Sequence, residues 1–511
     1  MLKKILKGVV FLIPFFLGTF GFLSAGESVW DAMFNCILMY TLNFDNPAPN
    51  LLSELARWTA PLVTAGAIAQ LIAGLRSWAR NLLIRFRKDS TAVYGPESDK
   101  ELIEAECGGR IVRTRGWEDF QKAQRYVLLG SDAENTAFLN RNSGALKDRE
   151  VYLQSTSWRP QMIEEKRLHV FSVEENAARL FWKQSGLCRD YAERAQDGRY
   201  AIVLIGFGRL GEELLYWGLQ FNLFDPKQKI SYHVFPEGDD KGLKDFLELR
   251  PALSRLTDEV KPHDENWRGQ AELLRSAQRV IVCDQQNTER TVQDLLFLAP
   301  QTAVDVLSGE DVFYRSLAPD SIQGSGQTAG QGQKKYNIRL FPWRREALHA
   351  AYIFNDGLLA AAKAINLRYE HIYSGIDETP ENAQACWEKL DAFTRYSNIS
   401  SADYHEITRQ MLYFREGMTP DGRSPEEALA IFEKADEDTK MLFAELEHMR
   451  WCSYHYLNNW DYAPIKKKDR VRRLHPLLVP FAELPAGEPE KDAENVDRLF
   501  RVAAGREEKG K

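Results

Sequence analysis

A strand, a glycine-rich turn and a helix follow one another without a break in the stretch AIVLIGFGRLGEELLYWGLQ. The apolar run 201–205 predicts a buried strand, and 209–219 has the spacing of a helix. Between them, Gly206, Gly208 and Gly211 form a Gly-x-Gly-x-x-Gly turn, in which glycines permit a tight bend and let a phosphate approach the helix N-terminus. This order predicts a doubly wound parallel α/β sheet with a nucleotide site at the turn.

Further strands are predicted after this turn, and the first of them supplies a candidate ligand contact. The run 229–235 ends near Glu237, at the place where an acid could accept a hydrogen bond from a ribose hydroxyl. The later strands are 280–283, 303–307 and, beyond a Gly/Gln/Ser-rich linker at 323–335, 337–341. The alternative interpretation of the glycine turn is a loop that serves only close helix–strand packing and subunit assembly.

A similar alternation of short apolar runs and helical patterns precedes this region and predicts another doubly wound sheet. Its first turn has Gly95 alone where a nucleotide-binding loop would have three glycines, so we expect no dinucleotide there in the usual way. The predicted strands are 91–95, 110–114, 126–130, 150–154 and 168–173, and the predicted helices are 100–107 and 133–140.

Two apolar segments lie near the N-terminus. The run 9–25 follows Lys3, Lys4 and Lys7, and the run 58–75 is close to the roughly 20 residues that a membrane span needs and is followed by five basic residues. Because positive charge stays on the cytoplasmic side, this pattern predicts two spans in the cell inner membrane with both termini in the cytoplasm. The alternative is a cleaved signal peptide followed by one anchor.

The segment between these runs combines a short helical pattern with an abrupt break. The break reads Thr41, Leu42, Asn43, Phe44 and Asp45. Irregular backbone at membrane depth is tolerated only where it is buried in protein or lines water, so we expect a re-entrant pore loop in an oligomer. The alternative is an amphipathic loop that lies on the lipid surface.

The order of span, helix beginning Trp-Asp-Ala, Thr-initiated turn and second span resembles the two-span pore module of potassium-type channels. The filter in that family reads TVGYGD, and residues 41–46 keep the threonine and an aromatic residue but lack both glycines. The resemblance implies a pore for a permeant cation with weak selectivity and an acidic ring at Asp45. The two α/β lobes behind it resemble RCK (Rossmann-like) domains over about 91–367, which implies a homotetramer with a cytosolic gating ring.

The C-terminal region has helical patterns at 346–367, 381–396 and 403–416, followed by a stretch dense in aromatic residues and histidine. Over about 444–500 this stretch resembles the ryanodine-receptor (RYR) repeat domain, from which it departs at Asn459 and Ala463. The residue types favour a small-ligand pocket, with rings that stack on a base and cations that face phosphates. The candidate residues are Arg450, Trp451, Trp460, Tyr462 and His475, with the basic run 466–473 beside them. The alternative is a set of core aromatic residues with a solvated basic loop.

The composition limits the classes of function that remain for this chain. The 511 residues carry a net charge of −7, which argues against a nucleic-acid binder. The six cysteines form no CxxC pair and indicate neither disulfides nor zinc. His448 and His455 are seven residues apart without acid or thiol ligands at workable spacing, so no metal is expected. No triad or carboxylate pair stands out, and the chain is therefore predicted not to be an enzyme.

Together these patterns predict four domains: a two-span module at 1–88, a degenerate RCK-like domain at 89–195, a second RCK-like domain at 196–370, and a helical linker with an RYR-like domain at 371–511. The predicted function is an oligomeric ion channel in contact with membrane lipid and gated by a nucleotide such as NAD, ATP or a cyclic nucleotide. The alternatives are a non-conducting, membrane-anchored nucleotide sensor or signalling scaffold and a membrane NAD-dependent oxidoreductase.

Overall fold

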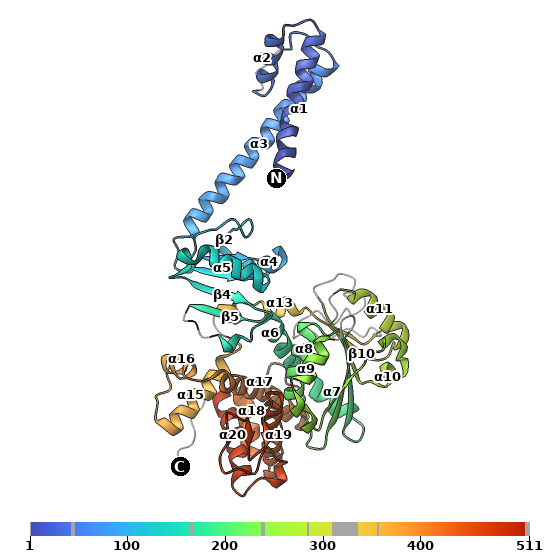
Figure 1. Cartoon of the computed structure of the whole chain (residues 1–511), viewed down its shortest axis with the longest axis vertical. Helices are drawn as coiled ribbons and strands as arrows, with labels where there is room; N and C mark the ends of the chain where they lie inside the picture. The colour runs from blue at the N-terminus through green and yellow to red at the C-terminus, as the bar shows by residue number, and fades with distance from the viewer. Residues whose placement is uncertain are drawn as a thin grey trace. The chain divides into compact units, whose positions relative to one another are not determined.

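The computed structural model describes residues 2–41, 46–163, 165, 167–236, 241–283, 286–308, 336–354 and 357–505 (Figure 1). The chain divides into two compact units. The first unit contains residues 1–92 and 109–124, and the second contains residues 93–108 and 125–511. The four predicted domains are not tested by this division and stay a prediction.

The first unit is built mainly from three helices, α1 (Leu2–Ser24), α2 (Val29–Met39) and α3 (Leu51–Ile84). Asn50 caps α3, because its side-chain oxygen accepts hydrogen bonds from the N–H groups of Leu52 and Ser53. The helices enclose a small core of Phe22, Ala32, Cys36, Met39, Ala56 and Ala60.

The prediction of two membrane spans is wrong. Among the residues that the structure describes, no helix is both long enough and apolar enough to cross a bilayer. Helix α3 also carries charged residues, with Arg57 before and Arg76 after the stretch that was predicted to span. The two-span fold class, the resemblance to a channel pore and the multi-pass inner-membrane localisation are therefore corrected.

The predicted filter segment begins at the end of α2. The hydroxyl of Thr41 donates to the carbonyl oxygen of Leu38 at 2.7 Å, which closes the last turn of that helix. Leu42, Asn43, Phe44 and Asp45 lie outside the described residues. Since the spans that would place this segment in a membrane are not supported, the prediction of an ion channel with a permeant cation is wrong as well.

The first sheet is parallel and has the strand order β2-β1-β3-β4-β5, the order of flavodoxin-like doubly wound folds. Strand β1 is shared, since its first two residues belong to the first unit and its last two to the second. The strands are β1 (Thr91–Tyr94), β2 (Ile111–Val112), β3 (Arg125–Leu128), β4 (Glu150–Gln154) and β5 (Leu168–Phe171), and the helices are α4 (Glu97–Cys107) and α5 (Asp132–Leu146).

The second sheet has the strand order β11-β10-β9-β6-β7-β8, and all of its strand pairs are parallel. Numbered along the chain from β6, this is the order 3-2-1-4-5-6 of dinucleotide-binding Rossmann sheets. The strands are β6 (Arg199–Ile205), β7 (Lys229–Phe235), β8 (Glu259–Pro262), β9 (Arg279–Val282), β10 (Ala303–Leu307) and β11 (Ile338–Phe341), and the helices between them are α8 (Arg209–Phe221), α9 (Lys241–Glu248), α10 (Ala271–Ser276) and α11 (Thr288–Leu298).

The helix α6 (Val173–Gln184) leads from the first sheet toward the second and is buried on nearly all of its sides. Its cations Arg179 and Lys183 both bind the carboxylate of Asp403, at 2.5 and 2.7 Å. Asp403 lies on α17 (Ala392–Arg415), more than 200 residues further along the chain. The pairing fixes α6 to the C-terminal helices, since a buried charge is costly without a partner.

The C-terminal region of the second unit is a helical assembly in which α17, α18, α19 and α20 lie side by side (Figure 1). The predicted helix 381–396 is in fact two helices, because Asp391 caps α17 by accepting a hydrogen bond from the N–H of Thr394. The remaining elements are α7 (Leu187–Arg194), α13 (Trp343–Ala347), α14 (Ala350–Phe354), α15 (Ala360–Ser374), α16 (Pro380–Glu388), α18 (Pro425–Lys434), α19 (Glu437–Leu457), α20 (Glu488–Ala503), β12 (Asp461–Tyr462) and β13 (Leu474–His475).

Candidate functional site

The best-formed candidate site lies at the carboxyl ends of β6 and β9, where the strand order of the second sheet reverses. Ligands of doubly wound sheets bind at this switch point, because the connections on either side lead to opposite faces and leave a crevice. The glycine turn from β6 to α8 lies here, and so does Cys283, whose thiol donates to the carbonyl oxygen of Gly206 at 2.9 Å.

The three predicted glycines have three different roles in the turn. Gly206 has a φ of +95°, a conformation that other residues rarely adopt. A Cβ atom on Gly211 would lie 2.7 Å from the carbonyl oxygen of Gly206, so helix and turn are in contact there. A Cβ atom on Gly208 would meet nothing within 4 Å. The turn therefore has open space at its middle glycine, next to the first N–H groups of α8.

We expect Gly211→Ala to lower the free energy of unfolding by roughly 1–3 kcal/mol, because the added methyl group would overlap a backbone oxygen that cannot rotate away. Chemical denaturation of the two proteins measures the difference. Gly269→Ala is a matched control, since that glycine has open space around it and lies in another part of the same unit. A Gly211→Ala protein as stable as the control would show that the turn is not close-packed.

Three guanidinium groups surround the first turns of α8. Arg209 binds Glu212 at 3.0 Å and Glu213 at 2.6 Å. Arg250 lies 3.9 Å from Glu212, and Arg159, from the loop after β4, lies 3.9 Å from Glu213 and 4.0 Å from the centre of the Tyr216 ring. The three arginines share the carboxylates of Glu212 and Glu213, which are favourably placed at the N-terminus of a helix.

Burial and neighbouring charge shift the pKa values of this cluster. Burial disfavours the charged form of Arg159, but Glu213, Tyr216, Tyr396 and Glu175 together outweigh that effect and raise the pKa of the arginine. The pKa of Arg250 is lowered by burial and by the charge of Arg159. Burial, together with the charge of Glu213, raises the pKa of Glu175 on α6 to about 6. The arginines stay charged, while an acid next to them changes its charge in the physiological range.

The predicted ribose acceptor Glu237 lies outside the described residues. The strand that leads to it, β7, carries His233, whose Nδ1 lies 2.9 Å from Nε2 of His263 after β8. His263 in turn lies 3.0 Å from a carboxylate oxygen of Glu265 and stacks on the ring of Phe235. These polar groups lie beside β7. They were not predicted from the sequence, because His233 and His263 are 30 residues apart.

The predicted RYR-like pocket is only partly assembled. The rings of Trp451 and His475 meet edge to face at 4.8 Å, and those of Trp460 and His475 lie 6.3 Å apart. Trp460 belongs to a small core with Cys452 and Leu478. Tyr462 is 46% exposed and pairs with His475 across β12 and β13. The structure thus brings Trp451, Trp460 and His475 together, and Tyr462 lies at the edge of this group.

Arg450 does not face these rings. Its Nε and Nη2 atoms donate to the two carboxylate oxygens of Glu447, both at 2.8 Å, and Nη1 donates to the hydroxyl of Ser400 on α17. The guanidinium has no free edge for a phosphate, so Arg450 is a buried structural residue. On a helix, adjacent residues point to different faces, which is why Arg450 and Trp451 separate.

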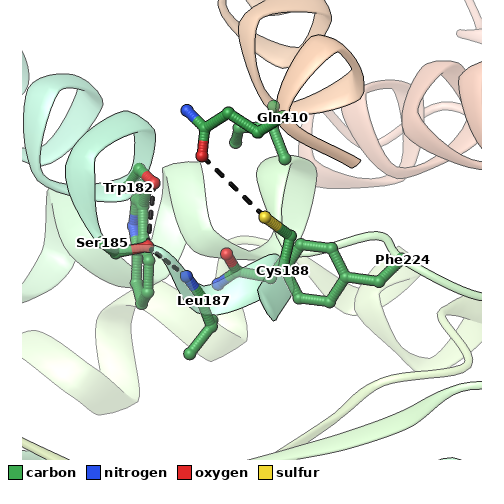
Figure 2. A pocket seen from close by; sticks show the side chains of 8 residues that line it. Trp182, Ser185, Leu187, Cys188, Phe224 and Gln410 are labelled. Atoms are coloured by element: carbon green, nitrogen blue, oxygen red, sulfur yellow. Dashed lines mark hydrogen bonds between the residues drawn. The ribbon is translucent and has the colours of Figure 1, made fainter. Parts of the chain in front are cut away.

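A pocket that sequence reasoning missed lies between α6, α7 and α17 (Figure 2). The thiol of Cys188 points toward the side-chain oxygen of Gln410, at 3.8 Å. Burial raises the pKa of this thiol to about 12, so it is a poor nucleophile. The empty volume is about 160 Å³, below the roughly 300–1,000 Å³ of ligand pockets, so this is a packing defect and not a site.

Metal ligation has no geometric basis in the ranges that the structure describes, because no three His, Cys, Asp or Glu side chains are grouped there closely enough to hold an ion. His448 and His455 illustrate the reason. His448 binds Asp492 at 3.2 Å and the carbonyl oxygen of Val479 at 2.9 Å, whereas His455 lies against Trp451. The two histidine side chains contact different partners.

The chain was compared with known proteins. No family model and no curated protein matches it. It is similar to L-tryptophan dehydrogenase from Nostoc punctiforme, with 12% identity, coverage of 69% of this chain and 88% of that chain, and a TM-score of 0.25. It is also similar to a D-lactate dehydrogenase from Treponema pallidum, with 9% identity, coverage of 65% and 98%, and a TM-score of 0.22.

A third similar structure is a phosphoglycerate oxidoreductase from Rhizobium etli, with 12% identity, coverage of 66% and 97%, and a TM-score of 0.21. Likenesses at this level do not assign an activity. The prediction that this chain is not an enzyme therefore stays a prediction. The resemblances to channel, RCK and RYR families are not matched by any family model.

Proposed function

We propose that this chain is a nucleotide-binding protein that holds a dinucleotide of the NAD type at the switch point of its second sheet. The observation that carries the proposal is the open space at Gly208, between a turn that requires Gly206 and a helix contact that requires Gly211. A pyrophosphate in that space would accept hydrogen bonds from the first N–H groups of α8, which have no partners within the helix.

The strand order supports a dinucleotide over a mononucleotide. The sheet contains two halves, β6–β8 and β9–β11, on either side of the switch point. In sheets of this order, each half receives one nucleoside of the ligand, and the pyrophosphate lies between them. The guanidinium groups of Arg209 and Arg250 lie beside the first turns of α8 and would balance the phosphate charge.

The proposal is tested by titrating the purified full chain with NAD⁺ and NADH and measuring the heat of binding. In Gly208→Val, the side chain would fill the phosphate space without backbone strain, because the φ of Gly208 is −81°. We expect this substitution to weaken binding at least about 100-fold, since it removes the contacts to both phosphates. Gly269→Val is the control, because it adds the same side chain in open space elsewhere in the unit.

Thermal unfolding of both variants shows whether the fold is kept. Equal binding by Gly208→Val and Gly269→Val would overturn the proposed site. Absence of binding in the unsubstituted chain, with either redox form of the dinucleotide, would overturn the proposed ligand.

A further inference from the structure

Helix α3 carries a long row of exposed side chains. The row follows steps of four and three residues in turn along the whole helix, and nine of its ten members are apolar or alanine. Leu51, Trp58, Leu62 and Leu83 are each more than 70% exposed. The row consists of Leu51, Leu55, Trp58, Leu62, Ala65, Ala69, Ile72, Arg76, Ala79 and Leu83 and is called the α3 seam.

The α3 seam is separate from the surface that α3 uses inside its own unit. The inner face of the helix carries Ser53, Ala56 and Ala60, which are buried, and the two alanines pack in the core formed with α1 and α2. The seam residues are turned away from that core and have no apolar cover within the unit. A helix of 34 residues is about 50 Å long, so the uncovered row is large for a protein surface.

We propose that the α3 seam pairs with the same helix of a second copy of this chain. Steps of four and three average 3.5 residues, which is the repeat that keeps one side of a helix against a supercoiled partner. A helix with a heptad repeat of this kind can pair with its own copy, because symmetric association places identical faces together. A single polar residue in such a seam, here Arg76, fixes the register of pairing.

The α3 seam carries little charge. The pair formed by Glu54 and Arg57 lies beside the seam and is satisfied within the helix at 3.5 Å. The seam itself contains one cation and no acid, so it offers little to a strongly charged partner. Apolar contact with another seam is therefore the interaction that buries most of this surface.

Sedimentation of the full chain at micromolar concentration tests the proposal. We expect the unsubstituted chain to be oligomeric and the Leu62→Glu/Ile72→Glu double variant to dissociate at a concentration at least about tenfold higher, because charge is placed at the centre of the seam. Phe297→Glu is the control, since Phe297 is exposed on α11 and lies outside the seam.

A cysteine variant keeps the test valid if the charged variant does not fold. Ala69→Cys places a thiol on the seam, and we expect oxidation to link two copies, whereas Phe297→Cys should stay unlinked. A monomeric unsubstituted chain, or a charged variant that associates as well as Phe297→Glu, would overturn the proposal. Seam-dependent binding to phosphatidylcholine vesicles by a chain that stays monomeric would also overturn it and assign the seam to lipid.

Discussion

Arg450→Ala should lower the free energy of unfolding by about 3–5 kcal/mol, because it leaves the carboxylate of Glu447 buried without its counter-charge. Arg450 is 2% exposed, and all of its hydrogen bonds are made within the packing of α17 and α19. The hydroxyl of Ser401 and the amide of Asn495 also donate to Glu447, at 3.1 and 3.5 Å, but two neutral donors do not replace a guanidinium. Denaturant unfolding followed by circular dichroism measures the loss.

The matched control replaces both partners. In Glu447→Gln/Arg450→Met the volume is nearly kept and no charge is left buried, so we expect a smaller loss than in the single variant. Dinucleotide binding at the glycine turn should be unchanged in any variant that folds. A loss below about 1 kcal/mol for Arg450→Ala would contradict the structural role, because that is the average effect of an unremarkable substitution.

The contribution of Asp258 to stability should fall by about 4 kcal/mol as the pH rises from about 4 to about 8. Burial raises the pKa of this carboxyl from 3.8 to about 7, although it accepts hydrogen bonds from the N–H of Ile230 and the amide of Gln228. The folded state therefore binds the proton more tightly than the unfolded state. The stabilisation is fully present below about pH 4 and is lost as the pH rises through about 7.

The difference between wild type and Asp258→Asn isolates this effect from other titrating groups. Asparagine keeps an oxygen that accepts from Ile230 but has no charge to gain, so the variant should be the more stable protein at about pH 8 and lose that advantage at about pH 4. Asp264→Asn is the control, because Asp264 is exposed and follows β8, the strand that Asp258 precedes. A wild-type-minus-variant difference that is constant with pH would contradict the prediction.

The second sheet shows what local sequence signals can specify. The strands at 229–235 and 303–307 were predicted with the bounds that the structure has, because each is rich in residues that favour strands and lies between polar turns. The glycine turn was predicted from its Gly-x-Gly-x-x-Gly spacing between a strand and a helix. Strand β8 (Glu259–Pro262) was missed, since its two central residues, Val260 and Lys261, do not form an apolar pattern and its pairing with β7 is set by the sheet.

Helix α6 shows what local signals cannot specify. Its sequence contains Glu174, Glu175 and Arg179, which favour an exposed surface, yet all three are buried. Their partners come from other elements, for example Tyr396, whose hydroxyl donates to Glu175 at 3.0 Å. Burial of polar residues depends on contacts that no local pattern records.

The membrane interpretation failed for a related reason. The apolar stretch 58–75 was interpreted as an independent span, whereas it is the middle of one 34-residue helix that begins at Leu51 and carries charges on both sides of the stretch. Hydropathy alone does not distinguish a span from a helix whose apolar side meets protein. The proposed pairing of the α3 seam would make α3 a helix of the second kind, and the seam is recognised only when the exposure of its residues is known.

The pairing of α6 with Asp403 also bears on how the protein is made. A chain leaves the ribosome from its N-terminus, so Arg179 emerges 224 residues before the carboxylate that neutralises it. During that interval, burying α6 would cost the desolvation of two cations without the carboxylate that binds both of them. The final packing of α6 therefore waits until α17 has been synthesised.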